Sequence, residues 1–181
     1  MQQTIETERL TLRPWTMNDV DALYDGLKEF EVTKNLIIPY PYTKQDAINF
    51  INNHLKNSTK SYSYAVVLKG TEHVIGGTSL DLDEKTQKYK GGIWLNKKYI
   101  GFGYGTEVFK ARAKFAFEVL KLKELNNGFF DWNEKSFRMQ KKLGYKVVGK
   151  RKTFCPALNK EVTEILTILT KQDFYNALNK L

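Results

Sequence analysis

A run of glycines at residues 100–106, Ile-Gly-Phe-Gly-Tyr-Gly-Thr, has the composition of an anion-binding loop. Glycine has no Cβ, so the backbone N–H groups of such a loop can turn inward and come close to a phosphate. Apolar residues follow at helical spacing over 108–119. A helix that begins near Tyr104 would add free N–H groups and the positive end of its dipole, which favours a pyrophosphate.

Two common phosphate-binding motifs do not fit this run. A dinucleotide fingerprint that starts at Gly101 needs a third glycine where the chain has Thr106. A Walker A loop needs Gly-Lys-Ser or Gly-Lys-Thr, and neither tripeptide occurs in the sequence. The run is therefore either a phosphate site of another kind or a tight turn between a strand and a helix.

The single cysteine and the two histidines offer little further chemistry. One cysteine excludes a disulfide framework, and Cys155 with His54 and His73 cannot complete a Cys/His zinc site. We therefore expect no metal. No motif links either histidine to Cys155, so this residue is expected to be a structural or exposed thiol rather than a nucleophile.

The positive charge is unevenly distributed along the chain. The net charge is +9, and residues 1–90 hold 11 Lys and Arg against 12 Asp and Glu, whereas residues 91–181 hold 18 against 8. Eight basic residues and no acidic residue lie between Lys135 and Lys152. This asymmetry indicates either an anionic partner, such as a nucleic acid, an acidic protein or a phosphorylated cofactor, or a solvated basic surface.

Seven short segments have the composition or the alternation of strands. The segments 62–68 and 74–82 are separated by Lys69-Gly70-Thr71-Glu72, which predicts a hairpin. Phe129, Phe130 and Trp132 are expected to be core residues of their strand, with the lining of a cleft as the alternative for Trp132. The seven predicted strands are 9–13, 62–68, 74–82, 93–95, 127–132, 145–148 and 165–169.

Helices are predicted between these strands. Thr16-Met-Asn-Asp19 resembles a capping box with Asp in place of the usual Glu, and it precedes helical spacing over 20–27. Thr43 is expected to cap a second helix. The remaining helices are 104–120, 134–143 and 171–178. Helices interleaved with a mostly antiparallel sheet place the chain in the α/β or α+β classes. The apolar side of the second helix consists of Ala47, Ile48, Ile51 and Leu55.

The length and the composition predict one globular domain over 1–181. The chain has 181 residues, 41% of them hydrophobic, and no repeat or linker divides it. No apolar run approaches the roughly 18 residues of a membrane span. The first ten residues lack the basic and apolar regions of a signal peptide. We therefore expect a cytoplasmic protein without a membrane partner.

The glycine run resembles motif A of the GNAT superfamily of acyl-CoA-dependent N-acyltransferases, whose pattern is Arg/Gln-x-x-Gly-x-Gly/Ala. Gly103 and Gly105 match the glycine positions, whereas Ile100 stands where Arg or Gln is usual. Segments 7–14, 75–77 and 92–96 resemble the RimJ/RimL-type branch, which includes enzymes that acetylate the N-termini of ribosomal proteins.

The segment around Asn133 carries the resemblance furthest. Asn133-Glu-Lys-Ser136 is followed by Leu-Gly-Tyr, with Asn133 and Gly144 eleven residues apart as the branch requires. Together these segments extend the resemblance over about residues 7–170. It implies the GNAT fold, which is a mixed and mostly antiparallel sheet, flanked by helices, that splays apart after its fourth strand.

The resemblance also implies that acetyl-CoA is the cosubstrate. The backbone of Trp94 and Leu95 would pair with the pantetheine amides, and Asn133 would bond the pantetheine or cysteamine portion. Part of the basic run would meet the phosphates of CoA. The backbone amides implied to cradle the pyrophosphate are those of Ile100, Gly101, Phe102, Gly103, Tyr104, Gly105 and Thr106.

The implied reaction is direct attack of a primary amine on the acetyl thioester. The acceptor is a protein N-terminal α-amino group or a small amine. Many GNAT enzymes have a tyrosine as the acid that protonates the thiolate, but Gln140 stands at that position. In the RimJ/RimL-type branch a serine three residues after the asparagine can serve as the acid instead, and Ser136 stands at that position. The alternative is that Ser136 is an ordinary hydroxyl residue at the start of a helix.

No general base is assigned. Lys90 stands where relatives often carry a glutamate, and the acidic residues that could substitute are each expected to be solvated rather than catalytic. Two alternatives to the enzyme remain: a non-catalytic acyl-CoA-binding sensor or partner subunit, and a basic nucleic-acid-binding protein. The nucleic-acid-binding alternative is disfavoured because the aromatic residues lie in predicted core strands rather than among the basic residues. The acidic residues considered as substitutes are Asp81, Asp83, Glu84, Glu31 and Glu164.

Overall fold

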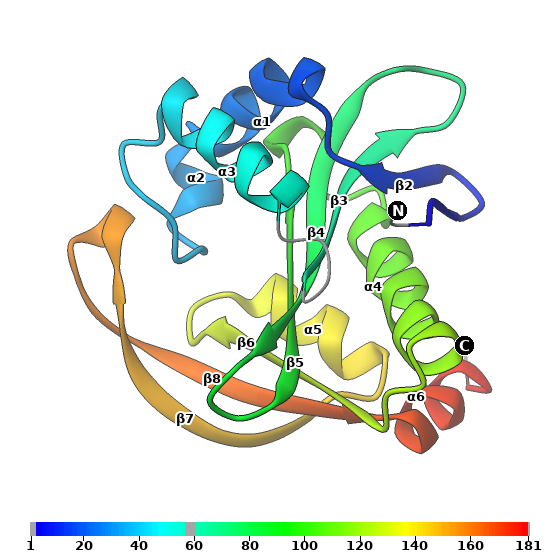
Figure 1. Cartoon of the computed structure of the whole chain (residues 1–181). Helices are drawn as coiled ribbons and strands as arrows, with labels where there is room; N and C mark the ends of the chain where they lie inside the picture. The colour runs from blue at the N-terminus through cyan, green and yellow to red at the C-terminus, as the bar shows by residue number, and fades with distance from the viewer. Residues whose placement is uncertain (1–2, 57–60, 181) are drawn as a thin grey trace.

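A computed structural model describes residues 3–56 and 61–180 and shows one sheet of eight strands within them (Figure 1). The strand order is β1-β2-β3-β4-β5-β6-β8-β7. The pair β5 and β6 is parallel, and every other neighbouring pair is antiparallel. The expected mixed, mostly antiparallel sheet is therefore confirmed. The strands are β1 Ile5–Glu6, β2 Leu10–Pro14, β3 Ser61–Leu68, β4 Val74–Asp83, β5 Lys88–Leu95, β6 Glu124–Phe130, β7 Lys146–Cys155 and β8 Lys160–Thr170.

The sheet splays apart between β5 and β6. Their register consists of one pair, Lys90 with Asn126, whereas β4 and β5 pair from Gly76–Leu95 to Asp83–Lys88. This pair lies near the N-terminal end of both strands, and the strands run parallel, so they separate toward their C-terminal ends. The splay follows the fourth strand as expected, if the two-residue strand β1 is not counted.

Helices cover both faces of the sheet (Figure 1). One core cluster contains Leu23 and Ile51 and lies between the first helices and the sheet, and another contains Phe109, Leu125 and Phe174 on the opposite face. The helices on each face of the sheet therefore pack on an apolar layer of their own. On the first side lie α1 Val20–Leu27, α2 Phe30–Thr33 and α3 Lys44–Lys56, and on the other α4 Tyr104–Lys114, α5 Glu134–Lys142 and α6 Lys171–Leu178.

Several predicted boundaries are wrong, most of all in β7 and β8. Their ladder extends from Lys146–Ile168 to Cys155–Lys160, well beyond the predicted 145–148 and 165–169. Most of β7 is exposed, its valines included, so it lacks the alternation that marks a half-buried strand. β6 ends at Phe130, and Trp132 lies beyond it, 38% exposed rather than in the core.

The helices also differ from their predicted extents. The helix expected over 104–120 is α-helical to Lys114 and continues as a π-helical turn over Phe115–Val119. Val119 and Leu55 were expected on apolar faces, but each is more than half exposed. The short helix α2 was not predicted, because four residues are too few to show helical spacing.

The capping box at Thr16 is confirmed and includes an ion pair. The Asp19 carboxylate accepts a hydrogen bond from the Thr16 backbone N–H (2.8 Å) and two from the Arg13 guanidinium (both 2.8 Å). Burial raises the pKa of Asp19, but the hydrogen bonds from Arg13 and Thr16 outweigh burial, so the pKa lies below its usual value. This cluster fastens the start of α1 to β2.

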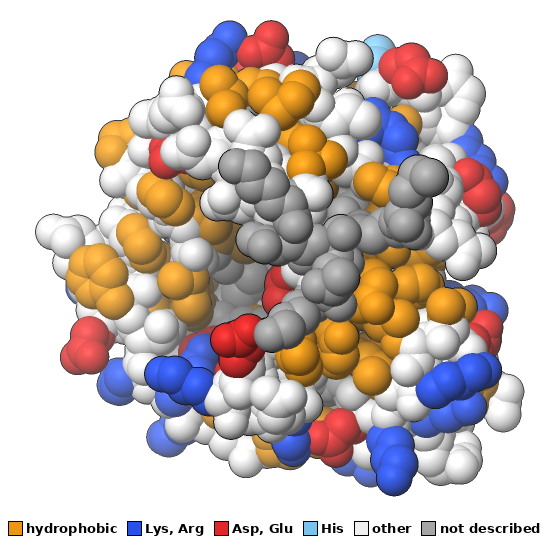
Figure 2. Space-filling model, viewed as in Figure 1, with side chains coloured by type: hydrophobic (Ala, Val, Ile, Leu, Met, Phe, Trp, Pro, Cys, Tyr) orange, Lys and Arg blue, Asp and Glu red, His pale blue; other side chains and the backbone are white. Residues whose placement is uncertain are grey.

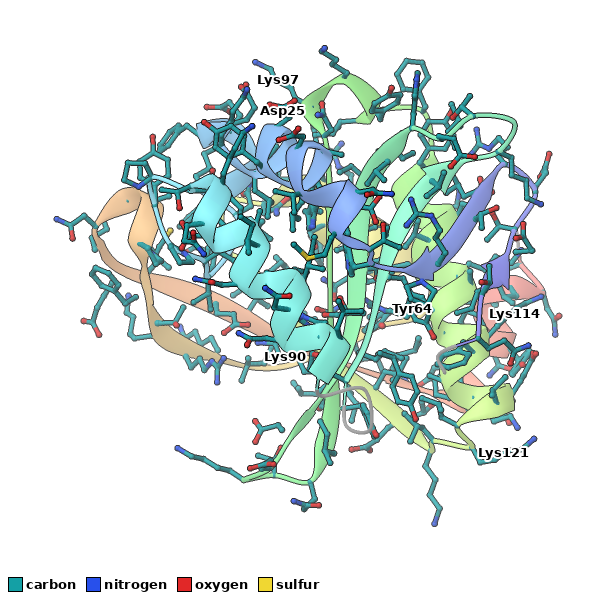
Figure 3. The ribbon with its side chains drawn as sticks, turned by 45° about the horizontal axis from the view of Figure 1, so that its top comes forward. Asp25, Tyr64, Lys90, Lys97, Lys114 and Lys121 are labelled. Atoms are coloured by element: carbon teal, nitrogen blue, oxygen red, sulfur yellow. The ribbon has the colours of Figure 1, made fainter. Side chains whose placement is uncertain are left out.

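We expect Asp19→Asn to lower the free energy of unfolding at pH 7 by about 2 kcal/mol, because charge-assisted hydrogen bonds are lost. A lowered pKa means that Asp19 stabilises the fold fully above its unfolded pKa of about 3.9 and loses this effect as the pH falls through the folded value. The difference between wild type and variant in urea unfolding should shrink below that pH. Asp25→Asn is the control, because Asp25, which is labelled in Figure 3, forms an exposed ion pair with Lys28. Equal losses in both variants would contradict this expectation.

Candidate active site

The separation of β5 from β6 leaves one edge of β5 without a strand partner. Beyond Lys90 the register between the two strands includes no further pair in the described residues. A Cβ built on Gly92 would meet no atom within 4 Å, so the sheet face at this point borders open space. Figure 2 shows the molecule hollowed near the centre of this view, with hydrophobic side chains to the left of the hollow. The arrangement can hold an extended ligand along β5.

The end of β5 is anchored through its side chains. The Trp94 ring stacks on Trp15, with ring centroids 6.5 Å apart, and packs against Gly26 and Gly77. Leu95 packs on the opposite face of the sheet, in a cluster that includes Val108. The sequence-predicted residues Trp94 and Leu95 therefore lie beside the opening, with their side chains held and the outer backbone edge of the strand free.

The glycine run forms the connection from β5 to α4. Gly101 and Gly103 have φ values of 101° and 84°, a backbone conformation that favours glycine. The Ile100 N–H donates to the Lys97 carbonyl (3.4 Å). Within the described part of the chain, the next six N–H groups, from Gly101 to Thr106, make no hydrogen bond, and the Glu107 N–H makes the first bond of α4, to Gly103. Six consecutive donors at a helix start can bind a pyrophosphate.

Arg9 holds this loop, a role that the sequence reasoning did not assign. The Arg9 guanidinium donates to the Phe102 carbonyl (3.0 Å) and pairs with Glu107 (2.7 Å). Glu107 also accepts a hydrogen bond from the Thr7 hydroxyl (2.6 Å). Burial raises the pKa of Glu107, but the hydrogen bonds from Thr7 and Arg9 outweigh burial and lower it. The only sequence signal for this contact was the resemblance of segment 7–14 to the RimJ/RimL-type branch.

Asn133 and Ser136 lie together at the start of α5. The Asn133 side chain caps the helix by accepting a hydrogen bond from the Ser136 N–H (3.1 Å). The Ser136 hydroxyl accepts one from Gln140 Nε2 (3.0 Å), and Gln140 Oε1 accepts one from the Thr167 hydroxyl (2.6 Å). Gln140 is 1% exposed. Thr167 therefore fixes the orientation of the Gln140 amide, and this leaves the Ser136 hydrogen free to be donated elsewhere.

Glu164 was expected to be solvated, and this expectation is wrong. The Glu164 side chain is 4% exposed and accepts hydrogen bonds from Lys90 Nζ (2.6 Å) and Arg151 Nε (2.7 Å). Burial raises the pKa of Glu164, but the hydrogen bonds and charges of both cations outweigh burial and lower it. The sequence could not reveal this cluster, because its residues come from β5, β7 and β8.

The remaining candidate residues are held by packing or by hydrogen bonds to other parts of the fold. Cys155 is fully buried beside Phe130 and Val162, and its thiol lies 3.6 Å from the Lys34 carbonyl. Trp132 Nε1 donates to Asn35 (3.1 Å). The basic run is divided between α5 and β7. In residues 3–56 and 61–180, no group of three or more His, Cys, Asp or Glu side chains is placed to hold a metal, and no helix is long and apolar enough to cross a membrane.

A family model described as the acetyltransferase (GNAT) domain matches residues 9–146. The chain belongs to the GNAT acetyltransferase family. The family resemblance seen in the sequence is thus confirmed. As a GNAT enzyme, the protein is an N-acetyltransferase that uses acetyl-CoA.

Known relatives resemble this GNAT enzyme over nearly its whole length. The uncharacterized N-acetyltransferase p20 of Bacillus licheniformis is 25% identical over 176 residues, covering 95% of this chain and 98% of the relative. A GNAT-family acetyltransferase from Bacillus anthracis has a TM-score of 0.81 and 25% identity, covering 94% of this chain and 99% of its own. RimJ of Mycobacterium smegmatis, solved in complex with CoA-disulfide, shares the fold with a TM-score of 0.83 and 13% identity, covering 96% and 91%.

Proposed function

We propose that this enzyme transfers the acetyl group of acetyl-CoA to a protein N-terminal α-amino group, and that residues 1–181 form one catalytic domain. The observation that carries the proposal is the opening between β5 and β6, which leads to a loop whose six N–H groups from Gly101 to Thr106 make no hydrogen bond within the described residues. A ligand with an extended amide arm and a pyrophosphate matches these two features. The class of acceptor is supported by the likeness in fold to solved structures described as a putative ribosomal-protein-serine acetyltransferase and a ribosomal-protein-S5-alanine acetyltransferase.

The proposed cofactor contacts follow the strand and the loop. The backbone N–H and C=O of Leu95 face away from β4 and pair with the pantetheine amides, as an added strand would, whereas the backbone of Trp94 pairs with Gly77 of β4 and holds the end of the strand. The pyrophosphate binds the loop over 101–106, with Ile100 shaping its entry. Asn133 Oδ1 is occupied by the helix cap, so its amide hydrogens bond the cysteamine portion.

The proposed reaction is a direct acyl transfer. The acceptor enters as an ammonium and first loses one proton to solvent, because only the neutral amine has a lone pair for attack. Its nitrogen attacks the thioester carbonyl carbon, and backbone N–H groups near Leu95 bind the oxygen that becomes negative. The carbon–sulfur bond then breaks, the nitrogen releases its extra proton to water, and the CoA thiolate takes a proton from a nearby acid that water reprotonates.

Ser136 is the proposed donor of the proton to the thiolate. Its hydroxyl oxygen already accepts a hydrogen bond from Gln140, so its own hydrogen can point to the sulfur. Gln140 occupies the position of the tyrosine in other GNAT enzymes and acts here by holding Ser136. Proton transfer from a positioned group contributes roughly 10²- to 10⁴-fold to such reactions.

Glu164 is a poor candidate for the general base. A base works best when its pKa lies near the working pH, whereas Lys90 and Arg151 keep the pKa of Glu164 low. Both carboxylate oxygens are also occupied by these cations. Loss of the ammonium proton to water requires no carboxylate and is the route that we propose.

Calorimetric titration with acetyl-CoA at physiological salt, with ATP and NAD as controls, tests this proposal. We expect acetyl-CoA alone to bind with micromolar affinity. N-terminal peptides should then release CoA thiol, which a thiol reagent detects. Binding without thiol release from any amine would favour an acyl-CoA sensor, and absence of binding would overturn the cofactor assignment.

A further inference from the structure

The cluster of Lys90, Arg151 and Glu164 lies on the same side of the sheet as the open space beside Gly92. Side chains alternate along a strand, so Lys90, Gly92 and Trp94 of β5 share one face. Glu164 lies over Gly128 of β6, since a Cβ on Gly128 would collide with the Glu164 carboxylate. Lys90 is labelled in Figure 3, near the end of α3 in that view. The cluster therefore bridges the two halves of the splayed sheet.

This cluster has more hydrogen-bond donors than its single carboxylate can satisfy. Lys90 Nζ and Arg151 Nε each bond one oxygen of Glu164, and the other donors of both side chains make no hydrogen bond within the described residues. The Lys90 side chain is 38% exposed and that of Arg151 51%, so a ligand can reach them. Asn126, the register partner of Lys90, also has a buried amide nitrogen without a partner among the described residues.

Nearby acidic groups do not satisfy these donors. Asp81 is paired in register with Lys90, but its carboxylate accepts hydrogen bonds from the Ser61 hydroxyl and from the Ser79 hydroxyl (2.6 Å). Its bonds therefore point along β4 and toward β3. Glu164 is buried and held between the two cations. The cluster thus presents cationic donors, rather than acceptors, to the open side.

The distance along β5 relates this cluster to the proposed transfer point. Lys90 and Trp94 are four residues apart, which corresponds to about 13 Å along a strand. An extended acceptor peptide rises by about 3.3 Å per residue. If its α-amine lies near Trp94, then its second to fourth side chains fall within reach of the long Lys90 and Arg151 side chains.

We propose that Lys90 and Arg151 form an acceptor subsite that selects N-termini with an acidic side chain at the second to fourth position. The inference rests on the proposed function and specifies its substrate class. A carboxylate would receive charge-assisted hydrogen bonds from both cations. A polyamine would instead place a second ammonium beside two cations, so such acceptors are disfavoured.

The test compares two peptides that differ only in charge. Both begin with serine and have uncharged tails, and one carries Glu at positions two to four where the other carries Gln. Their affinities for the full-length protein are measured by calorimetry with and without CoA, and their kcat/KM values by release of CoA thiol. We expect the Glu peptide to be favoured about 10-fold or more, and less so at high salt, where charges are screened.

Two matched variants on β7 test whether Arg151 causes the preference for the Glu peptide. Arg151→Gln keeps the Lys90–Glu164 pair and should reduce the preference for the Glu peptide about 10-fold, while the affinity for acetyl-CoA stays unchanged. Lys150→Gln changes the neighbouring residue on the other face of β7 and should leave the preference intact. If Arg151→Gln fails to fold, Lys90→Gln takes its place.

Equal affinities for the two peptides in the wild type would overturn the subsite, as would a preference that Arg151→Gln leaves intact. These outcomes differ from failure of the proposed function, in which acetyl-CoA does not bind or no peptide releases thiol. The peptide titration without CoA decides the inference even in that case.

Discussion

Replacing Ser136 by alanine is expected to lower turnover about 10²-fold while the affinity for acetyl-CoA stays nearly constant. The variant removes the hydroxyl that would protonate the CoA thiolate, but it leaves the backbone of β5 and the glycine loop intact. Steady-state release of CoA thiol gives kcat, and calorimetry gives the affinity. Gln140 loses a hydrogen-bond partner in this variant, so a stability loss of about 1–3 kcal/mol is also expected and is measured separately by urea unfolding.

Two control variants separate the chemistry from the effect on the helix. Ser136→Thr keeps the hydroxyl and should retain turnover within about 10-fold of the wild type. Lys135→Ala changes an exposed residue in the same helical turn and should have little effect. If Ser136→Ala turned over at the wild-type rate, Ser136 would be only a residue of the helix start. The acid would then have to come from water.

Substituting Gly103 by valine should weaken the binding of acetyl-CoA about 10-fold or more, a loss of about 1.4 kcal/mol. Gly103 has a φ of 84°, which a β-branched residue adopts only with strain. A Cβ there would also lie 3.4 Å from the Arg9 guanidinium, which holds the loop. The loop would therefore shift, and the N–H donors would no longer converge on the pyrophosphate.

Gly149→Val is the matched control for this loop variant. Gly149 lies in β7, has no positive φ, and a Cβ there would meet nothing within 4 Å. It should bind acetyl-CoA as the wild type does. Unchanged affinity in a folded Gly103→Val protein would defeat the assignment of the loop to the pyrophosphate. Circular dichroism and thermal unfolding establish whether each variant is folded.

Local patterns in the sequence were sufficient to predict most elements and the glycine loop between β5 and α4. The helical spacing after Thr16 and Thr43 and the glycine run each depend on residues a few positions apart, and all are found in the structure. The resemblance to the GNAT family added the splay of the sheet. Boundaries were poorly predicted where a strand is exposed, as in β7, because an exposed strand needs no apolar alternation.

The long-range contacts around the candidate site were decided only by the tertiary structure. Arg9 reaches the loop at Phe102, and Lys90 meets Glu164, across 93 and 74 residues of sequence. Gln140, which the sequence marked only as a departure from the family pattern, meets Thr167 and orients Ser136. Strand register and helix docking determine which distant side chains meet, and these depend on packing over the whole molecule. The residue types were visible in the sequence, but their pairing follows from the fold.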